Sequence, residues 1–453
     1  MKILIKNGRL IDPVGGLDTV GDLALATGRI VSIGQVNADF DADRVIDATG
    51  CIVAPGLVDL AVRLREPGHE HEGMLESELA AAAAGGVTSV VCLPDTDPTL
   101  DEPGLVEMLK LRARKLSRCR LFPLGALTRG LKGETLTEMA ELHEAGCVGY
   151  SQAEAPVRDT QVLQRALQYA ATFGYTVWLR PQDAWLGKGV AASGAIATRL
   201  GLSGVPVAAE VIALQTIVEL VRVTGARAHL CRLSSAAGVE IVRRAKAEGL
   251  PITADVSINS LMLTDMDIGF FNSAMRVVPP LRQGRDRDAL QAALKDGTLD
   301  ALVSDHTPVS EDEKMLPFGE AEPGATGLEL LLSLALKGAG LEAGPAASLD
   351  GKRLAAALAT VTSGPVKVLG EAIGSLASSA GRLVQGGVAD ICVFDPAVSW
   401  KVEGSQLLSQ GRHTPFAYES TGFELPGRVR LTLVAGQLAH EALEADSADA
   451  AQG

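Results

Sequence analysis

Apolar residues change their spacing twice along the chain. In residues 1–55 they alternate with polar residues in short segments such as ILIKNGRLID and RIVSIGQ, separated by Asn-Gly and Thr-Gly-Arg turns. A period of two is typical of half-buried strands. The same alternation returns after about residue 370, in GRLVQGGVADICVFDP and RVRLTLVAGQLAH. We therefore predict a small β-sandwich module built from both chain ends, residues 1–55 and 370–440.

Between these ends the pattern becomes strand and helix in turn. Short apolar segments are each followed by a stretch with apolar residues at helical spacing, as in LVEMLKLRARKL and GVEIVRRAKAEG. The eight segments begin near Leu57, Ser89, Arg120, Cys147, Thr176, Ala228, Ile252 and Ala301. Eight strand–helix units predict an α/β fold, a (β/α)8 TIM barrel over residues 56–369.

Composition narrows the class of protein. The 453 residues carry a net charge of −14, which argues against nucleic acid or an anionic membrane as a partner. The longest apolar run, ELAAAAAGGVTSVVCLP, is broken by turn residues, so we expect no membrane span. Six scattered cysteines without a CxxC pair are typical of reduced thiols in the cytoplasm. The acidic tail, residues 441–453, is expected to be disordered.

Several segments together resemble one family. The segment PGLVDLAVRLREPG is followed along the chain by GGVTSVVCLPDTDP, LGLSGVP, VPPLR, SDHTPV, ADICVFDP and HTPF. In frame and order these resemble the dihydroorotase family of cyclic amidohydrolases, over nearly the whole chain. The resemblance implies an amidohydrolase-type barrel whose active members hold zinc at the C-terminal ends of the strands.

The family's ligand positions carry other residues here. The resemblance aligns the two first-strand histidines, the fourth-strand aspartate and the fifth- and sixth-strand histidines with Ala61, Arg63, Gln152, Arg180 and Arg232. Asn259 and Ser260 stand in the seventh-strand motif. Asp305 alone keeps the family's residue, a metal ligand and general base. Arginine donates hydrogen bonds only and alanine offers no donor atom, so we expect neither zinc nor another cofactor.

The same resemblance marks remnants of a substrate site. Arg65 matches the family's carboxylate-binding arginine, and Asp95 stands where the family has a substrate-binding asparagine. Together with Asn259 these residues are the expected substrate remnant. An anionic Asp95 would repel an anionic substrate.

Three of the altered positions hold arginine, and their strands end at one face of the barrel. We therefore predict a charge cluster of Arg63, Arg180 and Arg232 around Asp305, in which Arg63 or Arg232 reaches the aspartate. Asp95 is a second candidate acid. Gln152 and Asn259 are expected to supply neutral hydrogen bonds at the edge. Excess positive charge would then leave room for a small anion.

The remaining histidines and Cys231 are expected to be structural. His69 and His71 in GHEHEG follow the strand and are predicted to lie in a solvent-facing loop. His306 follows Asp305 on a strand, so its side chain should point the opposite way. Cys231, beside Arg232, is expected to be a buried strand thiol rather than an activated one.

These changes predict a retained fold without its catalysis. The resemblance is closest to an inactive dihydroorotase-like chain that, in some bacteria, assembles with the catalytic chain of aspartate carbamoyltransferase. It implies that partner and a structural role in pyrimidine biosynthesis, and we also expect a homo-oligomer. Two alternatives stay open: an anion-binding regulatory module at the altered site, and an active cyclic amidohydrolase with unorthodox metal ligation.

Overall fold

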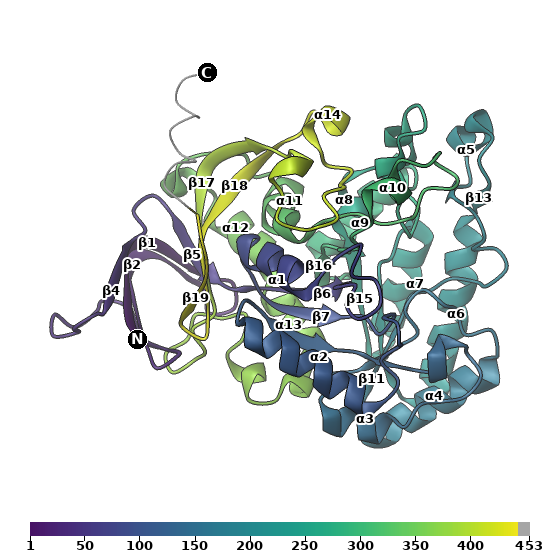
Figure 1. Ribbon diagram of the computed structural model, residues 1–453, viewed down its shortest axis with the longest axis horizontal. Helices are drawn as coiled ribbons and strands as arrows, with labels where there is room; N and C mark the ends of the chain where they lie inside the picture. The colour runs from purple at the N-terminus through teal and green to yellow at the C-terminus, as the bar shows by residue number, and fades with distance from the viewer. Residues whose placement is uncertain (443–453) are drawn as a thin grey trace.

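The computed structural model describes residues 1–442 and consists of a barrel with a smaller β module beside it (Figure 1). Residues 443–453 lie outside the described part, and they include most of the tail for which disorder was expected. The last strand of the β module runs as far as Glu441, so the module extends one residue beyond the expected boundary at residue 440.

The β module is built from both chain ends. Its strands are β1 (Lys2–Asp12), β2 (Leu17–Ala26), β3 (Arg29–Gly34), β4 (Arg44–Asp47), β5 (Ile52–Pro55), β17 (Ile391–Lys401), β18 (Glu424–Val434) and β19 (Gln437–Glu441). They form one sheet in the order β19-β18-β17-β5-β1-β2-β3, with β4 beside β1. The antiparallel pairing of β17 with β5 joins the two ends. Alternating residues such as Ile3, Ile5, Leu23 and Ile391 fill the module's own core.

The barrel contains eight parallel strand positions. They are β6 (Leu57–Val62), β7 (Val87–Cys92), β8 (Arg120–Pro123) continued by β9 (Gly125–Ala126), β10 (Tyr150–Ser151), β11 (Thr176–Leu179), β14 (Arg227–Leu230), β15 (Ile252–Ser257) and β16 (Ala301–Val303). The circle closes where Val62 pairs with His306. The predicted TIM barrel is confirmed. The fourth strand begins at Tyr150 rather than Cys147, and the third is interrupted at Leu124.

Amphipathic helices surround the strands. The longer ones are α1 (Leu75–Ala84), α2 (Pro103–Leu116), α4 (Thr160–Phe173), α6 (Val207–Thr224), α7 (Ala236–Ala247), α9 (Gly284–Asp296), α11 (Leu331–Gly338) and α12 (Gly351–Val361). The shorter ones are α3 (Met139–Ala145), α5 (Ala195–Leu200), α8 (Ile258–Met262), α10 (Glu311–Lys314), α13 (Ser363–Leu369) and α14 (Tyr418–Thr421). Their apolar faces pack on the strands in one large core. No helix within residues 1–442 is long and apolar enough to cross a membrane.

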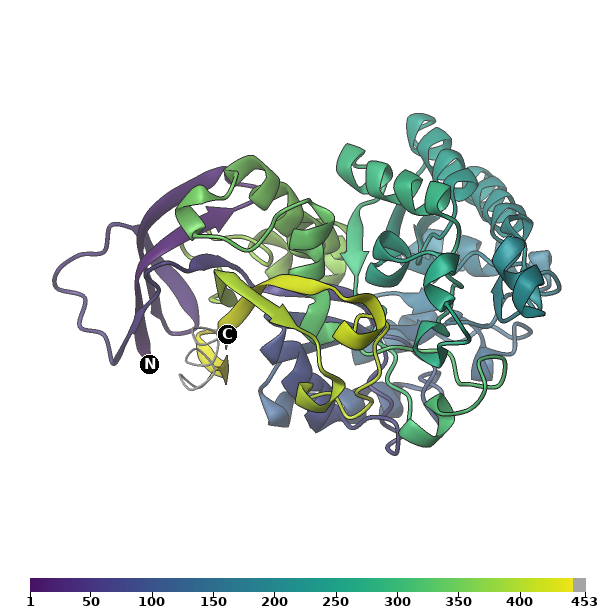
Figure 2. The ribbon, with the colours of Figure 1, turned by 90° about the horizontal axis from the view of Figure 1, so that it is seen from above.

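Residues 404–416, here called the strap, tie the β module to the barrel. They belong to the connection between β17 and β18, whose chain runs from the module onto the barrel (yellow in Figure 2). The Ser409 hydroxyl donates to the buried carboxylate of Glu78 on α1 at 2.7 Å, and the Gln410 amide donates to the same group at 3.0 Å. The amide of Thr326 donates to the carbonyl of His413 at 2.6 Å. The module is therefore anchored beside the strand ends that form the site.

Candidate functional site

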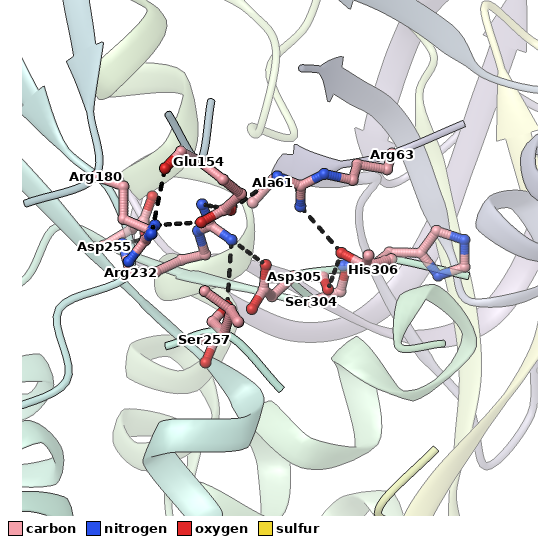
Figure 3. Close-up of polar contacts among 12 residues, drawn as sticks. Ala61, Arg63, Glu154, Arg180, Arg232, Asp255, Ser257, Ser304, Asp305 and His306 are labelled. Atoms are coloured by element: carbon pink, nitrogen blue, oxygen red, sulfur yellow. Dashed lines mark hydrogen bonds and ion pairs between the residues drawn. The ribbon is translucent and has the colours of Figure 1, made fainter. Parts of the chain in front are cut away.

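The predicted arginines meet at the C-terminal ends of the barrel strands, here called the mouth (Figure 3). Arg63 directly follows β6, Arg180 follows β11, and Arg232 lies two residues beyond β14. Asp305 lies two residues beyond β16. Parallel strands end on the same side of a barrel, so residues distant in sequence come within hydrogen-bonding range. All three arginine side chains are at least nine-tenths buried.

Glu154, in the loop after β10, holds these arginines together. Its Oε1 atom accepts from Arg63 Nη2 at 2.8 Å and also pairs with Arg232 Nη2. Its Oε2 atom pairs with Arg180 Nε. One carboxylate thus contacts three guanidinium groups, each from a different strand end. Ala153 just before it has φ 49°, and this left-handed turn precedes the residue that enters the mouth.

Two further acids complete the arginine cluster, defined here as Arg63, Arg180, Arg232, Asp95, Glu154 and Asp305. Arg232 Nη1 donates to Asp305 Oδ1 at 2.9 Å, which confirms the predicted contact with the aspartate. Arg63 Nε donates to Asp95 Oδ2 at 2.8 Å. Three guanidinium groups therefore face three carboxylates, and their formal charges balance when all are ionised.

The two central carboxyls respond oppositely to their surroundings. Burial disfavours an ionised Glu154, but the charges of Arg180, Arg232 and Arg63 outweigh it and hold the pKa of this carboxyl well below its usual range. Burial dominates at Asp305 and raises its pKa to about 6, although Arg232 and Arg63 oppose the rise. The nearby negative charge of Glu154 adds to the rise. Glu154 is thus the stronger counter-ion, and Asp305 is the acid that can take a proton near neutral pH.

The expected substrate remnants line what space is left. A pocket of about 140 Å³ is bordered by members of the arginine cluster together with Arg65, Asn259 and Glu322. Arg65 Nε contacts Glu72 Oε2 at 2.9 Å and the Pro308 carbonyl at 2.8 Å, so this arginine is already held by the protein. The Oδ1 atom of Asn259 is buried without a hydrogen-bond partner.

Two predictions about the mouth are wrong. Gln152 does not lie at the edge of the arginine cluster: its side chain accepts from Thr128 Oγ1 at 2.9 Å and donates to the Leu131 carbonyl at 2.7 Å. The expected excess of positive charge is also absent, because Glu154 supplies the missing acid. Glu154 is the carboxylate within YSQAEAPV, two residues beyond the position that alignment with the family indicated. The signal available in the sequence was an acidic residue so close to the end of a barrel strand.

The side chains at the mouth do not suit a zinc ion. Ala61 presents a methyl group where a ligand would be needed. The carboxylates of Asp95, Glu154 and Asp305 each pair with a guanidinium, and fixed cations beside them repel a metal ion. Zinc sites use imidazole, thiolate and carboxylate ligands around the ion, and no imidazole belongs to this cluster.

Two groups with metal-ligand atoms lie elsewhere in the described chain. One joins His229, Cys231 and Asp255, and the other joins His71, Glu72 and Glu313; in each, the ligand atoms lie within 4.8 Å of one another. In the first group His229 Nε2 already contacts Asp255 Oδ2 at 2.8 Å. Burial raises the pKa of the Cys231 thiol well above its usual value, which opposes an activated thiolate.

The other histidines lie largely as expected. His306 points away from Asp305 (Figure 3), and its Nε2 atom contacts Glu78 at 2.7 Å inside the protein. His71 is exposed and His69 is half-buried, both in the loop before α1. Neither histidine reaches the arginine cluster.

Comparison with known proteins identifies the family. A family model described as Dihydro-orotase-like matches residues 50–237. A dihydroorotase-like protein from Pseudomonas aeruginosa is 45% identical over 97% of this chain and 100% of its own length. The chain belongs to the dihydroorotase-like family of amidohydrolases. A second dihydroorotase-like protein, from Pseudomonas putida, is also 45% identical over 97% of this chain and 99% of its own length. A dihydroorotase from a Geobacter species is 39% identical over 98% of this chain and all of its own length.

Solved structures support the amidohydrolase fold of this dihydroorotase-like chain. L-hydantoinase from Arthrobacter aurescens superimposes with a TM-score of 0.81 at 24% identity, covering 97% of this chain and 96% of the hydantoinase. Dihydropyrimidinase from Brevibacillus agri gives a TM-score of 0.80 at 21% identity, with 97% and 95% covered. At these identities the likeness concerns the fold alone, a TIM barrel with a β module built from the chain ends.

Proposed function

We propose that this dihydroorotase-like protein does not catalyse a hydrolysis and serves as a structural subunit of aspartate carbamoyltransferase. The observation that carries the first part is Glu154, which binds three arginines where zinc ligands would have to converge. The family relation carries the second part, through the resemblance to inactive chains that assemble with that enzyme.

The argument against catalysis starts from what zinc supplies. When bound in an amidohydrolase, it lowers the pKa of water and polarises the amide that is attacked. Arg63, Arg180 and Arg232 can donate hydrogen bonds but cannot generate a nucleophile. Asp305 can take a proton near neutral pH, but a base without a metal-bound water has no activated nucleophile to produce. The carboxylates of the mouth are paired with arginines, which supports a structural role for the arginine cluster.

A metal and activity assay tests the first part. The purified chain is expected to contain far less than one zinc per chain and to show no interconversion of dihydroorotate and carbamoyl aspartate above background, with or without added zinc. Turnover that depends on metal would contradict the proposal and favour an active amidohydrolase with unorthodox ligation. Restoring two histidines, by Ala61→His with Arg63→His, is expected to leave the chain inactive, because Arg180 and Arg232 still occupy the mouth.

A co-purification experiment tests the second part. A tagged copy of this chain, isolated from its native cell, is expected to carry the catalytic chain of aspartate carbamoyltransferase in a fixed ratio. Deleting the gene should reduce the size and the activity of the transferase. A transferase of unchanged size and activity in the deletion strain would contradict the assembly role, whatever the outcome of the zinc assay.

A variant of Asp305 separates the proposed lack of catalysis from the proposed assembly role. Asp305→Asn removes the carboxylate of the family's general base but keeps the side-chain shape. If the chain acts only in assembly, this variant should restore transferase size and activity in the deletion strain as fully as the wild-type chain. Failure of a folded Asp305→Asn chain to do so would indicate chemistry at the mouth.

A further inference from the structure

A large cleft lies at the opposite end of the barrel from the mouth. Its volume is about 670 Å³, and its walls come from the last turns of α2, the start of β8, the 3-10 helix η6 (Gly370–Ser378) and the turn between β18 and β19. Arg120, the first residue of β8, marks the N-terminal end of the barrel strands. This floor cleft therefore lies between the barrel and the β module, which is a common place for ligand sites.

Within residues 1–442, the charged side chains that line the floor cleft are all basic. They are Lys110, Arg114 and Arg120, and no aspartate or glutamate of the described chain is among the lining residues. This positive lining contrasts with the chain as a whole, which has 55 acidic against 41 basic residues. The charge of the cleft is therefore local and opposite in sign to the net charge of the chain.

The three cationic side chains of the cleft differ in the number of hydrogen bonds and ion pairs that they already make within the protein. Arg114 is exposed on α2 and, within residues 1–442, has no side-chain hydrogen bond or ion pair. Lys110 Nζ makes one hydrogen bond, to the Ala145 carbonyl at 2.9 Å. Arg120 Nη1 pairs with Asp390, outside the lining. Each side chain therefore has N–H donors that are not used within the described chain, and in Arg114 this applies to every side-chain donor.

The rest of the lining is largely apolar. Leu121, Phe122, Val148 and Ile373 border the same space as the cations. Hydroxyl groups come from Ser117 and Ser375. A neighbouring cleft of about 420 Å³ shares the lining residues Ser375, Ala435 and Gln437 with it, so the two clefts lie side by side. A ligand here would meet cations on one side and an apolar surface on the other.

We propose that the floor cleft binds a phosphate-bearing ligand of mononucleotide size, with a phosphate group at Arg114 and Lys110 and an apolar ring against Phe122 and Ile373. A guanidinium fork holds phosphate oxygens through paired hydrogen bonds, and an ammonium adds a point charge. The volume falls within the range of pockets that enclose small organic ligands. The site is separate from the arginine cluster, so it does not depend on the proposed function of the mouth.

Calorimetric titration of the purified full chain tests the proposal. The probes are ATP, UTP, pyrophosphate and uridine, each in magnesium-free buffer at low salt. ATP and UTP should bind in a saturable way, pyrophosphate at least about tenfold more weakly because it lacks the apolar ring, and uridine with no detectable heat because it lacks the phosphates. Binding should weaken as salt rises, since exposed charges are screened.

Two charge-reversal variants make the test specific. Arg114→Glu should lower nucleotide affinity at least about tenfold, because it replaces a donor with a repelling carboxylate. Arg165→Glu, an equal change at an exposed residue of α4 outside the cleft, should leave affinity unchanged. Melting temperatures of both variants check that they fold.

The proposal is overturned by any of three results. One is no saturable binding of either nucleotide. Another is equal affinity for nucleotide and pyrophosphate, or for nucleotide and uridine. The third is an equal effect of Arg114→Glu and Arg165→Glu in folded protein.

Discussion

The two ends of the barrel arrange charge in opposite ways. At the mouth, three buried arginines face three carboxylates, and Glu154 alone contacts all three guanidinium groups. At the floor, Lys110, Arg114 and Arg120 line a cleft to which residues 1–442 contribute no acidic side chain. Buried charges must be compensated inside the protein, whereas exposed ones can remain available to a ligand. The comparison separates a cluster that holds the fold from a surface that can bind a partner molecule.

Removing the shared carboxylate of the mouth should have the largest effect on stability. Glu154→Gln leaves the buried Arg180 with a neutral partner only and weakens the contacts of Arg63 and Arg232. An uncompensated buried charge costs about 3–5 kcal/mol, and we expect the low end, about 3 kcal/mol, because about a third of the Glu154 side chain reaches solvent. Chemical denaturation of the variant measures this loss in the free energy of unfolding.

The control for Glu154→Gln is Asp312→Asn, a change at an exposed acid on α10. Its free energy of unfolding should stay within about 0.5 kcal/mol of the wild type. An equal loss in the free energy of unfolding in both variants would show that Glu154 stabilises the fold no more than an exposed surface acid does.

The two acids of the mouth should also differ in the pH dependence they confer. Asp305 has a pKa of about 6 in the folded protein, above the value of about 3.9 expected when unfolded. The folded state therefore binds the proton more tightly, so this group's contribution to stability is greatest below about pH 4 and is lost as pH rises through 6. The loss amounts to at most about 3 kcal/mol for a shift of about two units.

Denaturation of the wild type and Asp305→Asn between pH 4 and 7 measures that dependence. Wild-type stability should fall relative to the variant as the pH rises through this window. Glu154 behaves in the opposite sense: its lowered pKa gives stabilisation that is present above about pH 4.3 and is lost only in stronger acid. A constant difference between wild type and Asp305→Asn would show that Asp305 does not titrate there.

The smallest effect on stability is expected at the floor. Arg114→Ala removes a side chain without a hydrogen bond or ion pair in the described chain, so the free energy of unfolding should change by less than about 0.5 kcal/mol. Thermal denaturation without ligand checks this. A loss comparable to that of Glu154→Gln would mean that the floor cations hold the fold, and the comparison between the two ends would fail.

Sequence predicted much of the mouth because barrel strands impose a repeating frame. The family resemblance marked Arg63, Arg180 and Arg232 as residues at strand ends, and the barrel frame placed those ends together. Side-chain alternation along the strand also predicted correctly that His306 points away from Asp305. Glu154 was missed because the chain turns at Ala153, with φ 49°, and the acid enters two residues beyond the expected position. Side-chain alternation does not extend through a left-handed turn.

The floor cleft had no local signal at all. Lys110 and Arg114 lie on α2, Ile373 on η6 and Gln437 at the start of β19, so its walls come from segments more than 300 residues apart. Only the docking of the β module on the barrel brings them together. The sequence predicted that such a module exists, but it did not show which barrel face the module covers.

The arginine cluster has a consequence for the growth conditions under which this chain can be produced. A bound metal must be obtained from the surroundings, whereas a guanidinium group is synthesised with the polypeptide and stays charged at every physiological pH. Under the proposed function, the mouth of this barrel therefore needs no supply of trace elements. Starvation for zinc, or a chelator in the growth medium, should leave the yield and melting temperature of this chain unchanged.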